Sequence, residues 1–347
     1  MKMKIFTLIL VSITSSSCHS TLAEQTTNKV EKITVPPIIA AQPSPNTESL
    51  GNEIIADLLP DGSVLQQGTG DVIVNGTDVK RGDFPSTIMF KSSSGGRCTA
   101  TIVSENAALV AAHCGPYSGV NAASKKWSAW VNDGAGRLDN KMVCQNSPEA
   151  KFTYAQVEIR NLETGAVRYD TDLVDVSDDF SLCKFENPVS TGVGNKFERF
   201  ASAGPTVGSS LLLIGYGCQS QCQLDEDCPR VYGELKAGLT RVTHTPGFTK
   251  IGNSRTDRFD AAANDAYVCP GDSGGAAYIR KRGSNKWSDR HIVGVNSMVG
   301  PGKDKEMTSF IANTSSNKFL TWARQWAQQN QAELCGITSN AKNCKNM

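Results

Sequence analysis

The sequence has little net charge of either sign. Its 347 residues include 35 lysines and arginines and 34 aspartates and glutamates, which gives a formal net charge of +1. Proteins that bind nucleic acid or an anionic membrane by electrostatic attraction usually carry a basic excess or a basic patch. The composition therefore supports neither partner, and 39% hydrophobic against 20% charged residues fits a soluble globular protein.

The sequence also lacks a hydrophobic run long enough to cross a bilayer, which takes about 20 apolar residues. The apolar run over residues 5–13 follows two lysines and precedes small polar residues, a pattern typical of a secretory signal peptide. We predict a signal peptide over residues 1–23, a secreted or periplasmic protein, and no membrane partner once the signal is removed. A lipid anchor on Cys18 is an alternative, but the three serines before it match a lipoprotein signal poorly.

The sequence shows no internal repeat with a clear period, and the segment after the signal shows no sustained hydrophobic periodicity. Residues 24–72 are rich in Thr, Pro, Ser, Asn, Gln and Gly. A segment of this composition buries too little apolar surface to fold alone. We predict a pro-segment or linker there, poorly ordered in part.

Short apolar runs, separated by clusters of Gly, Asn, Asp and Ser, recur along the rest of the chain. Examples are STIMF at 86–90, TATIV at 99–103, ALVAA at 108–112 and FSLCKF at 180–185. Many short strands with turn signals between them predict an all-β sandwich or barrel.

One segment near the C-terminus has the spacing of a helix. Its apolar stripe consists of Phe319, Leu320, Trp322, Ala323 and Trp326. Three consecutive residues at 314–316, one threonine and two serines, offer N-caps. We predict a helix over residues 317–329 that docks on the β core.

Cysteine occurs eleven times, which leaves an even number when Cys18 is removed with the signal. In an exported protein this number predicts up to five disulfides, with buried free thiols and fewer bridges as the alternative. Cys98 and Cys114 are a favoured pair, because a hairpin between them would bring the two ends together. Closing that loop should stabilise the fold by roughly 3 kcal/mol and fix the direction of the neighbouring His113.

The stretch VCPGDSGGAA at 268–277 holds one hydroxyl, that of Ser273, between glycines and behind a cysteine. A serine acts as a nucleophile only where a base, in nearly every design a histidine, accepts its proton. His113 is the best base among four histidines, because it directly follows an apolar run and precedes a cysteine. The others lie in the signal segment, beside a proline and at a strand start: His19, His244 and His291.

The third group required is a buried acid that keeps the imidazole in one tautomer. Candidate aspartates cluster at positions 170, 172, 175, 178 and 179. Asp179 is preferred, because it immediately precedes the alternating strand at 180–185 and would be rigidly placed there. Asp178 is the next candidate, and the other three fit loop residues.

These stretches occur together in the order of one family. The chain resembles the trypsin-like serine peptidases of the chymotrypsin fold, in which the triad follows the order His, Asp, Ser. The similar stretches are IVNG at 73–76, GDFP at 82–85, CTATIVSENAALVAAHC at 98–114, DDFSLCKFENPV at 178–189, LLLIGYG at 211–217, CPGDSGG at 269–275 and HIVGVNS at 291–297. With the terminal helix they cover roughly residues 73–328.

The resemblance implies an all-β fold of two six-stranded antiparallel β-barrels with a C-terminal helix. The barrels are expected over roughly residues 73–195 and 196–315, within a peptidase domain over 73–330. A disulfide-closed tail would follow at 331–347. The gap from His113 to Asp179 is longer than is usual in the family, which implies an insertion around residues 116–170.

The resemblance also implies roles for the site residues. Ser273 would attack the scissile carbonyl, His113 would carry its proton, and Asp179 would orient the imidazole. The backbone N–H groups of Gly271 and Ser273 would face the developing oxyanion. No cofactor and no metal is implied.

A further role implied by the resemblance is an activation ion pair between Asp272 and the α-ammonium of Ile73, freed by cleavage. The four residues before Ile73 include neither Lys nor Arg. Either the activating enzyme is not trypsin-like, or cleavage follows Val72 by another specificity, or activation is absent.

The substrate pocket departs from the trypsin pattern. Its floor position holds Tyr267. A preference for Lys or Arg would need an aspartate at this position, and the nearby Asp265 is two residues away from it. Ser297 and Val299 are expected on the pocket wall, with Thr308 narrowing it. The resemblance therefore implies small or medium apolar residues before the cleaved bond, as in an elastase-type pocket.

The remaining cysteines depart from the family pattern as well. Cys269 lacks its usual partner, so one of three cysteines in the loop CQSQCQLDEDC, at 218–228, is expected to bond to it. A metal site in that loop is the alternative, which oxidising export and the lack of a histidine disfavour. Two further expected pairs are Cys144–Cys183 and Cys335–Cys344.

We therefore predict a secreted serine endopeptidase with protein or peptide substrates and protein inhibitors, acting as a monomer. A non-catalytic homologue that uses the fold for binding is one alternative, but all three triad positions are filled. A disulfide-rich adhesion domain is another, which leaves the ordered motifs unexplained.

Overall fold

The computed structural model describes most of the chain after residue 72. The described residues are 73, 76–91, 97–117, 119–132, 139–160, 167–191, 197–217, 233–244, 258–261, 266–284, 286–301, 307–338 and 343–344. The predicted signal peptide and nearly all of the predicted pro-segment lie outside the described residues, as do Asp265 and the three cysteines of the loop at 218–228.

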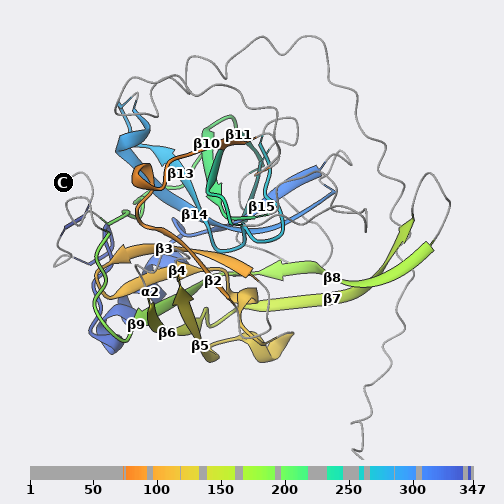
Figure 1. The fold of residues 1–347 in the computed structure, drawn as a ribbon, viewed down its shortest axis with the longest axis horizontal. Coiled ribbons are helices and arrows are strands. Elements are labelled where there is room, and N and C mark those ends of the chain that lie inside the picture. The colour runs from red at the N-terminus through yellow and green to blue at the C-terminus, as the bar shows by residue number, and fades with distance from the viewer. Residues whose placement is uncertain are drawn as a thin grey trace, which may run out of the picture. The chain divides into compact units, whose positions relative to one another are not determined.

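Six antiparallel strands form a closed barrel in the first half of the described chain (Figure 1). In order of pairing they are β2 (Thr87–Lys91), β3 (Arg97–Ser104), β4 (Ala107–Val110), β9 (Ser181–Phe185), β6 (Asp139–Asn146) and β5 (Lys126–Asn132). Burial alternates along β6, because every second side chain points into the barrel. In β3 every residue after Arg97 is buried, since its other face is covered as well.

Six further strands build the second antiparallel unit. In order of pairing they are β11 (Lys236–His244), β10 (Ser210–Gly215), β13 (Ala276–Arg280), β14 (Arg290–Pro301), β15 (Met307–Asn313) and β12 (Arg258–Ala261). A pairing between β11 and β12 joins the two ends of this order. The prediction of two six-stranded antiparallel units is confirmed. An extra strand, β1 (Thr77–Asp78), precedes the closed barrel in the chain and pairs with β11 of the second unit.

The expected insertion contains a long hairpin of β7 (Lys151–Arg160) and β8 (Val167–Ser177), which pair only with each other among the described strands. Figure 1 shows these two strands running together away from the closed barrel and the second unit. An isolated bridge joins Gly119 to Phe152 at the base of the hairpin. Short 3₁₀ helices occupy η2 (Arg81–Asp83), η3 (Ala112–Cys114), η4 (Val120–Ala122) and η5 (Trp287–Asp289).

The predicted C-terminal helix is present as α2 (Asn317–Asn330). Ser316 caps it by accepting a hydrogen bond from the Phe319 backbone N at 3.1 Å. Its apolar stripe packs on the first barrel, where the Phe180 ring lies 4.8 Å from Phe319 and 5.6 Å from Trp322 between centroids. This packing anchors the start of β9. No helix in the described part of the chain is long and apolar enough to cross a membrane.

Three disulfides link described cysteines, namely Cys98–Cys114, Cys144–Cys183 and Cys335–Cys344. All three were expected from the sequence. Cys269 is also disulfide-bonded, with a partner outside the described residues. The first bridge bears directly on the candidate site, because it joins β3 to the turn that carries His113.

Candidate active site

His113 lies in η3, just after β4 ends, and 15% of its side chain is exposed while both neighbours in η3 are buried. Cys114 is bonded to Cys98 of β3, which ties this turn to the barrel wall. At the next position, Gly115, a Cβ atom would lie 2.8 Å from the Trp127 Nε1 atom, so a side chain does not fit there. The backbone that carries the His113 imidazole is therefore held in one position.

Asp179 lies between β8 and β9 with 1% of its side chain exposed. Its Oδ1 atom accepts a hydrogen bond from the His113 backbone N at 2.9 Å, and its Oδ2 atom accepts one from His113 Nδ1 at 2.7 Å. The Ser297 Oγ atom donates another to Oδ2 at 2.5 Å. Because a carboxylate only accepts, the ring proton is assigned to Nδ1, which leaves Nε2 of a neutral imidazole as an acceptor.

The pKa values of the pair shift in opposite directions. Burial acts to raise the pKa of Asp179, but the charge of His113 and the hydrogen bonds from His113 and Ser297 outweigh it, so the pKa lies below its usual value. Burial acts to lower the pKa of His113, but the charge and hydrogen bond of Asp179 outweigh it, so the pKa lies above its usual value. The pair is thus suited to hold an imidazolium beside a carboxylate, the state a general base reaches after it takes a proton.

Asp178, the second candidate from the sequence, has a different partner. Its carboxylate forms an ion pair with Lys318 of α2 at 2.8 Å, and Lys318 also bonds Glu149 at 2.6 Å. The backbone of Asp178 has a φ of 50°, in the left-handed region, which helps the chain turn just before Asp179. The structure therefore brings Asp179, the preferred candidate, to the imidazole.

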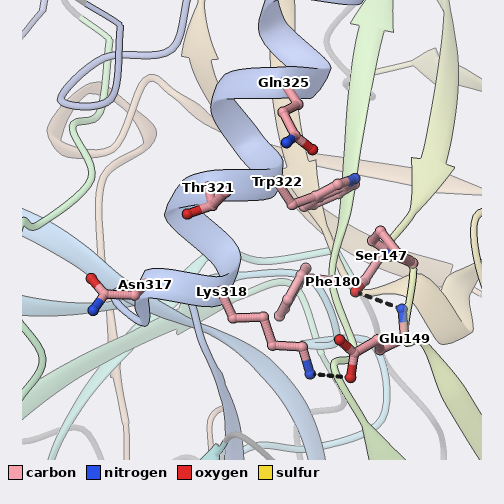
Figure 2. Close-up of a pocket in the computed structure, with 9 residues that line it drawn as sticks. Ser147, Glu149, Phe180, Asn317, Lys318, Thr321, Trp322 and Gln325 are labelled. Carbon is pink, nitrogen blue, oxygen red and sulfur yellow. Dashed lines mark hydrogen bonds and ion pairs between the residues drawn. The ribbon is translucent and has the colours of Figure 1, made fainter.

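Lys318 also lines a shallow pocket on the first barrel (Figure 2). The pocket has a volume of about 420 Å³ and lies between α2 and the start of β9. Its lining includes Trp322, Phe180 and Glu149, and none of the three predicted triad residues. This pocket therefore does not mark the candidate centre.

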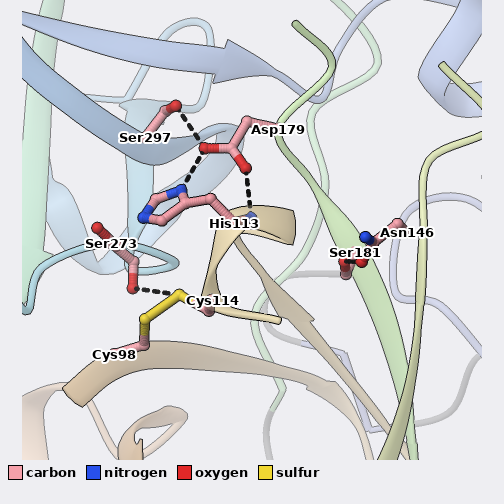
Figure 3. A network of polar contacts seen from close by, with 8 residues as sticks. All are labelled: Cys98, His113, Cys114, Asn146, Asp179, Ser181, Ser273 and Ser297. Carbon is pink, nitrogen blue, oxygen red and sulfur yellow. Dashed lines mark hydrogen bonds and ion pairs between the residues drawn. A yellow bond between two sulfur atoms is a disulfide. The ribbon is translucent and has the colours of Figure 1, made fainter. Parts of the chain in front are cut away.

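Ser273 lies in the serine loop, which we define as residues 269–275 before β13. Two of its glycines, Gly271 and Gly274, have φ values of 103° and 88°, which residues with a side chain rarely adopt. Figure 3 shows the His113 ring between Asp179 and Ser273, with its second nitrogen on the side of the serine. Among the described residues, His113 is hydrogen-bonded to Asp179 and not to the Ser273 hydroxyl. In enzymes without substrate the hydrogen bond between nucleophile and base is often long, and it shortens when the substrate binds.

Two backbone donors of the serine loop have no acceptor in the part of the chain that the structure describes. The N–H groups of Asp272, Gly274 and Gly275 each donate to a backbone carbonyl. Those of Gly271 and Ser273 have no acceptor within the described chain. Unpaired N–H groups are rare in folded proteins, and such donors can bind a negatively charged oxygen. These are the two groups that the sequence predicted for the oxyanion.

Asp272 is fully buried in the middle of the serine loop. Its carboxylate accepts hydrogen bonds from the backbone N–H of Gly217 at 2.8 Å and of Cys269 at 2.9 Å. Burial raises the pKa of Asp272 to about 7, and the two hydrogen bonds offset only part of that effect. At Gly215 and Gly217 a Cβ atom would overlap the Asp272 side chain, so only glycine leaves room for it.

Ile73, the predicted partner of Asp272, is also fully buried, in an apolar cluster with Leu213 and Val268. In the continuous chain its nitrogen is an amide and carries no charge. The ion pair with Asp272 thus stays a prediction about a chain cleaved before Ile73.

The pocket residues named from the sequence meet near one residue of β15. Val299 is the ladder partner of Ser309, and the Ser309 hydroxyl accepts a hydrogen bond from the backbone N of Val268, the residue after Tyr267. Thr308 precedes Ser309 and is buried, whereas Tyr267 and Val299 are partly exposed. The backbone therefore brings Tyr267, Val299 and Thr308 to the same part of the second unit.

Ser297 has a contact that the sequence did not predict. We expected it on the pocket wall, but its hydroxyl bonds Asp179. The pairing of β14 with β15 shifts register between Asn296 and Met298, and a bulge of this kind re-aims the side chain at its centre. No local residue pattern signals the bulge, so sequence reasoning had no means of finding this contact.

Phe152, at the base of the long hairpin, is another residue that the sequence did not single out. Its ring lies edge-on to the His113 ring, with 6.4 Å between centroids and 81° between planes. It is fully buried in a cluster with Ala112 and Val176, against which Met298 of β14 packs. The insertion thus contributes one wall beside the imidazole.

Comparisons with known proteins identify the family of the chain. The protein-family model described as trypsin matches residues 73–323. Among solved structures, the chain is similar to neuropsin, a serine protease expressed in the limbic system of mouse brain, at 18% identity and a TM-score of 0.45, over 72% of this chain and 98% of that one. No curated protein sequence matches the chain significantly. Because the family model covers well over half of its 347 residues, the chain belongs to the trypsin family of serine endopeptidases.

Proposed function

We propose that this endopeptidase cleaves peptide bonds through Ser273, His113 and Asp179. The observation that carries the proposal is the doubly hydrogen-bonded pair of His113 and Asp179 beside Ser273 (Figure 3), whose loop has two N–H groups with no acceptor among the described residues. A base, an orienting acid, a nucleophile and an oxyanion site are the four parts that acyl transfer requires.

The reaction follows from these positions. Ser273 Oγ attacks the carbonyl carbon while its proton passes to His113 Nε2, and the carbonyl electrons move onto oxygen. The N–H groups of Gly271 and Ser273 bind that oxyanion, each contributing about 3 kcal/mol in the transition state. When the tetrahedral intermediate collapses, the amine is expelled and takes the proton from His113. The acyl group stays on Ser273 as an ester. Water then attacks the ester by the same route, which releases the acid and restores the serine.

Labelling with a fluorophosphonate tests the proposal, because this probe reacts with an activated serine. We expect the processed wild type to be labelled at Ser273 and Ser273→Ala to remain unlabelled. The matched control is Ser202→Ala, which removes an exposed hydroxyl and should leave labelling intact. A folded, processed wild type that resists the probe would point to a non-catalytic homologue that uses the fold for binding.

We also propose that the enzyme prefers small or medium apolar residues before the cleaved bond. A tyrosine at the expected pocket floor gives a Lys or Arg side chain no countercharge, and a valine on the expected wall reduces the space. The same labelling experiment can be run with peptidyl phosphonates that differ only in this side chain. We expect valine and alanine probes to react at least about 10-fold faster than lysine or phenylalanine probes. A faster lysine probe would contradict the preference.

We further propose that the protein is exported, matures by cleavage before Ile73 and acts as a monomer on protein substrates, subject to protein inhibitors. The disulfides support export, because such bonds persist in oxidising compartments. The burial of both Ile73 and Asp272 supports the cleavage, since a new ammonium would compensate a buried carboxylate. N-terminal sequencing of the mature protein should begin at Ile73, and any other start would contradict this maturation step.

A further inference from the structure

Thr99 of β3 makes a cluster of contacts with the serine loop, although the two lie in different β units. Its hydroxyl donates a hydrogen bond to the Gly271 carbonyl at 2.8 Å and accepts one from the Tyr216 backbone N at 3.1 Å. Its own backbone N donates to the Ser273 carbonyl at 2.8 Å. Thr99 is fully buried, so water does not compete for these bonds.

These bonds fix the peptide groups around the oxyanion donors. The carbonyls of Gly271 and Ser273 belong to the peptide groups on either side of the one that carries the Ser273 N–H. Because Gly271 has no side chain and a φ of 103°, its local backbone has little intrinsic preference for one orientation. Holding both carbonyls therefore fixes the direction of the N–H group between them.

A Cβ atom at Gly274 would lie 2.1 Å from the Thr99 carbonyl oxygen, so the loop and the strand are in close contact on this side too. Within the described chain, the buried carboxylate of Asp272 in the serine loop accepts hydrogen bonds only from backbone N–H groups. The Thr99 hydroxyl is thus a constraint on the loop that is present in the continuous chain, before any ammonium is released.

We propose that Thr99 is a positioning residue, whose hydroxyl holds the serine loop so that the Gly271 and Ser273 N–H groups meet the oxyanion. The inference rests on the proposed function, since it assigns these groups to that oxygen. The hydroxyl does not touch the substrate, and it acts through the Gly271 carbonyl.

Thr99→Val tests the role, because valine keeps the β-branched shape and the backbone N–H and replaces only the hydroxyl, with a methyl group. We expect kcat to fall by about 10- to 100-fold with KM changed less than about 3-fold, because the oxyanion forms only in the transition state. Affinity for a peptide boronate, whose tetrahedral adduct mimics this state, should fall in proportion to kcat/KM. Thr99→Ser should restore most of both.

Thr101→Val is the matched control. It makes the same change two positions along β3, at a buried hydroxyl with no hydrogen-bond partner in the described structure. We expect this variant to keep the wild-type kcat. If Thr99→Val unfolds, Thr99→Ala removes the same hydroxyl with less bulk and is measured in its place.

The outcomes separate the two proposals. A wild-type protein that no fluorophosphonate labels overturns the proposed function. A labelled wild type whose Thr99→Val variant keeps its kcat overturns the role of Thr99 alone. Equal losses in Thr99→Val and Thr101→Val, or no recovery in Thr99→Ser, also overturn it, because a general packing defect would then explain the loss.

Discussion

Replacing His113 with alanine should lower kcat by at least about 10⁴-fold, because no other base then accepts the Ser273 proton. In the wild type the neutral imidazole is the reactive form, so kcat/KM should rise with pH through the His113 pKa. Asp179 holds that pKa above the ordinary histidine value, which moves the acid limb of the profile to higher pH. The measurement is kcat/KM against pH for the wild type and for His113→Ala, in which this limb should disappear.

His291→Ala is the matched control for this prediction. His291 lies in β14, and burial together with nearby Arg199 and Lys281 lowers its pKa below the ordinary histidine value. Its removal should leave both kcat and the acid limb in place. A loss of less than about 100-fold in His113→Ala would show that the base has been misassigned.

Asp179→Asn should lower kcat by about 10⁴-fold at neutral pH, as the equivalent change does in related triads. The reason lies in the hydrogen bonds around this side chain. Asp179 Oδ1 accepts from the His113 backbone N, which can only donate, so the asparagine carbonyl oxygen must take that position. The amide NH₂ then replaces Oδ2 and donates to His113 Nδ1. The ring proton moves to Nε2, where it blocks acceptance of the serine proton.

Asp178→Asn controls for the loss of a buried acid at this turn. It removes the charge that pairs with Lys318 but leaves the bonds to the imidazole intact. We expect it to lower thermal stability while kcat stays within about 3-fold of wild type. If Asp178→Asn lost as much activity as Asp179→Asn, the turn as a whole would matter and the tautomer argument would fail. Melting temperature and kcat, measured on the same preparations, separate the two effects.

The features that sequence reasoning found are those with local signatures. Helical spacing from Phe319 to Trp326 indicated α2, since one stripe must bury against the barrel. Ser273 stood out because the positive φ values of its loop require glycines at 271 and 274. His113 was marked by the small residues and the cysteine around it. Asp179 followed from the alternating strand after it, which set its position better than that of its neighbours.

The features that sequence reasoning did not find depend on contacts between distant segments. Ser297 reaches Asp179 only because β14 bulges against β15, and nothing in the residues near 297 announces a shift of register. Phe152 belongs to an insertion without a motif, and its place beside His113 follows from how the hairpin base docks. Thr99 fits an ordinary strand residue in the sequence, and its hydroxyl meets the Gly271 carbonyl only because the second β unit lies against the first.

Strand β3 is bonded through two adjacent residues to the segments that carry His113 and Ser273. Cys98 is bonded to Cys114, the residue after His113, and Thr99 holds the carbonyl of Ser273, which also lies 3.8 Å from the Cys114 sulfur. The segments that carry the His113 imidazole and the Ser273 hydroxyl are therefore both attached to β3. We therefore expect a small shift of one β unit against the other to change the distance between the His113 imidazole and the Ser273 hydroxyl less than other distances between the two units.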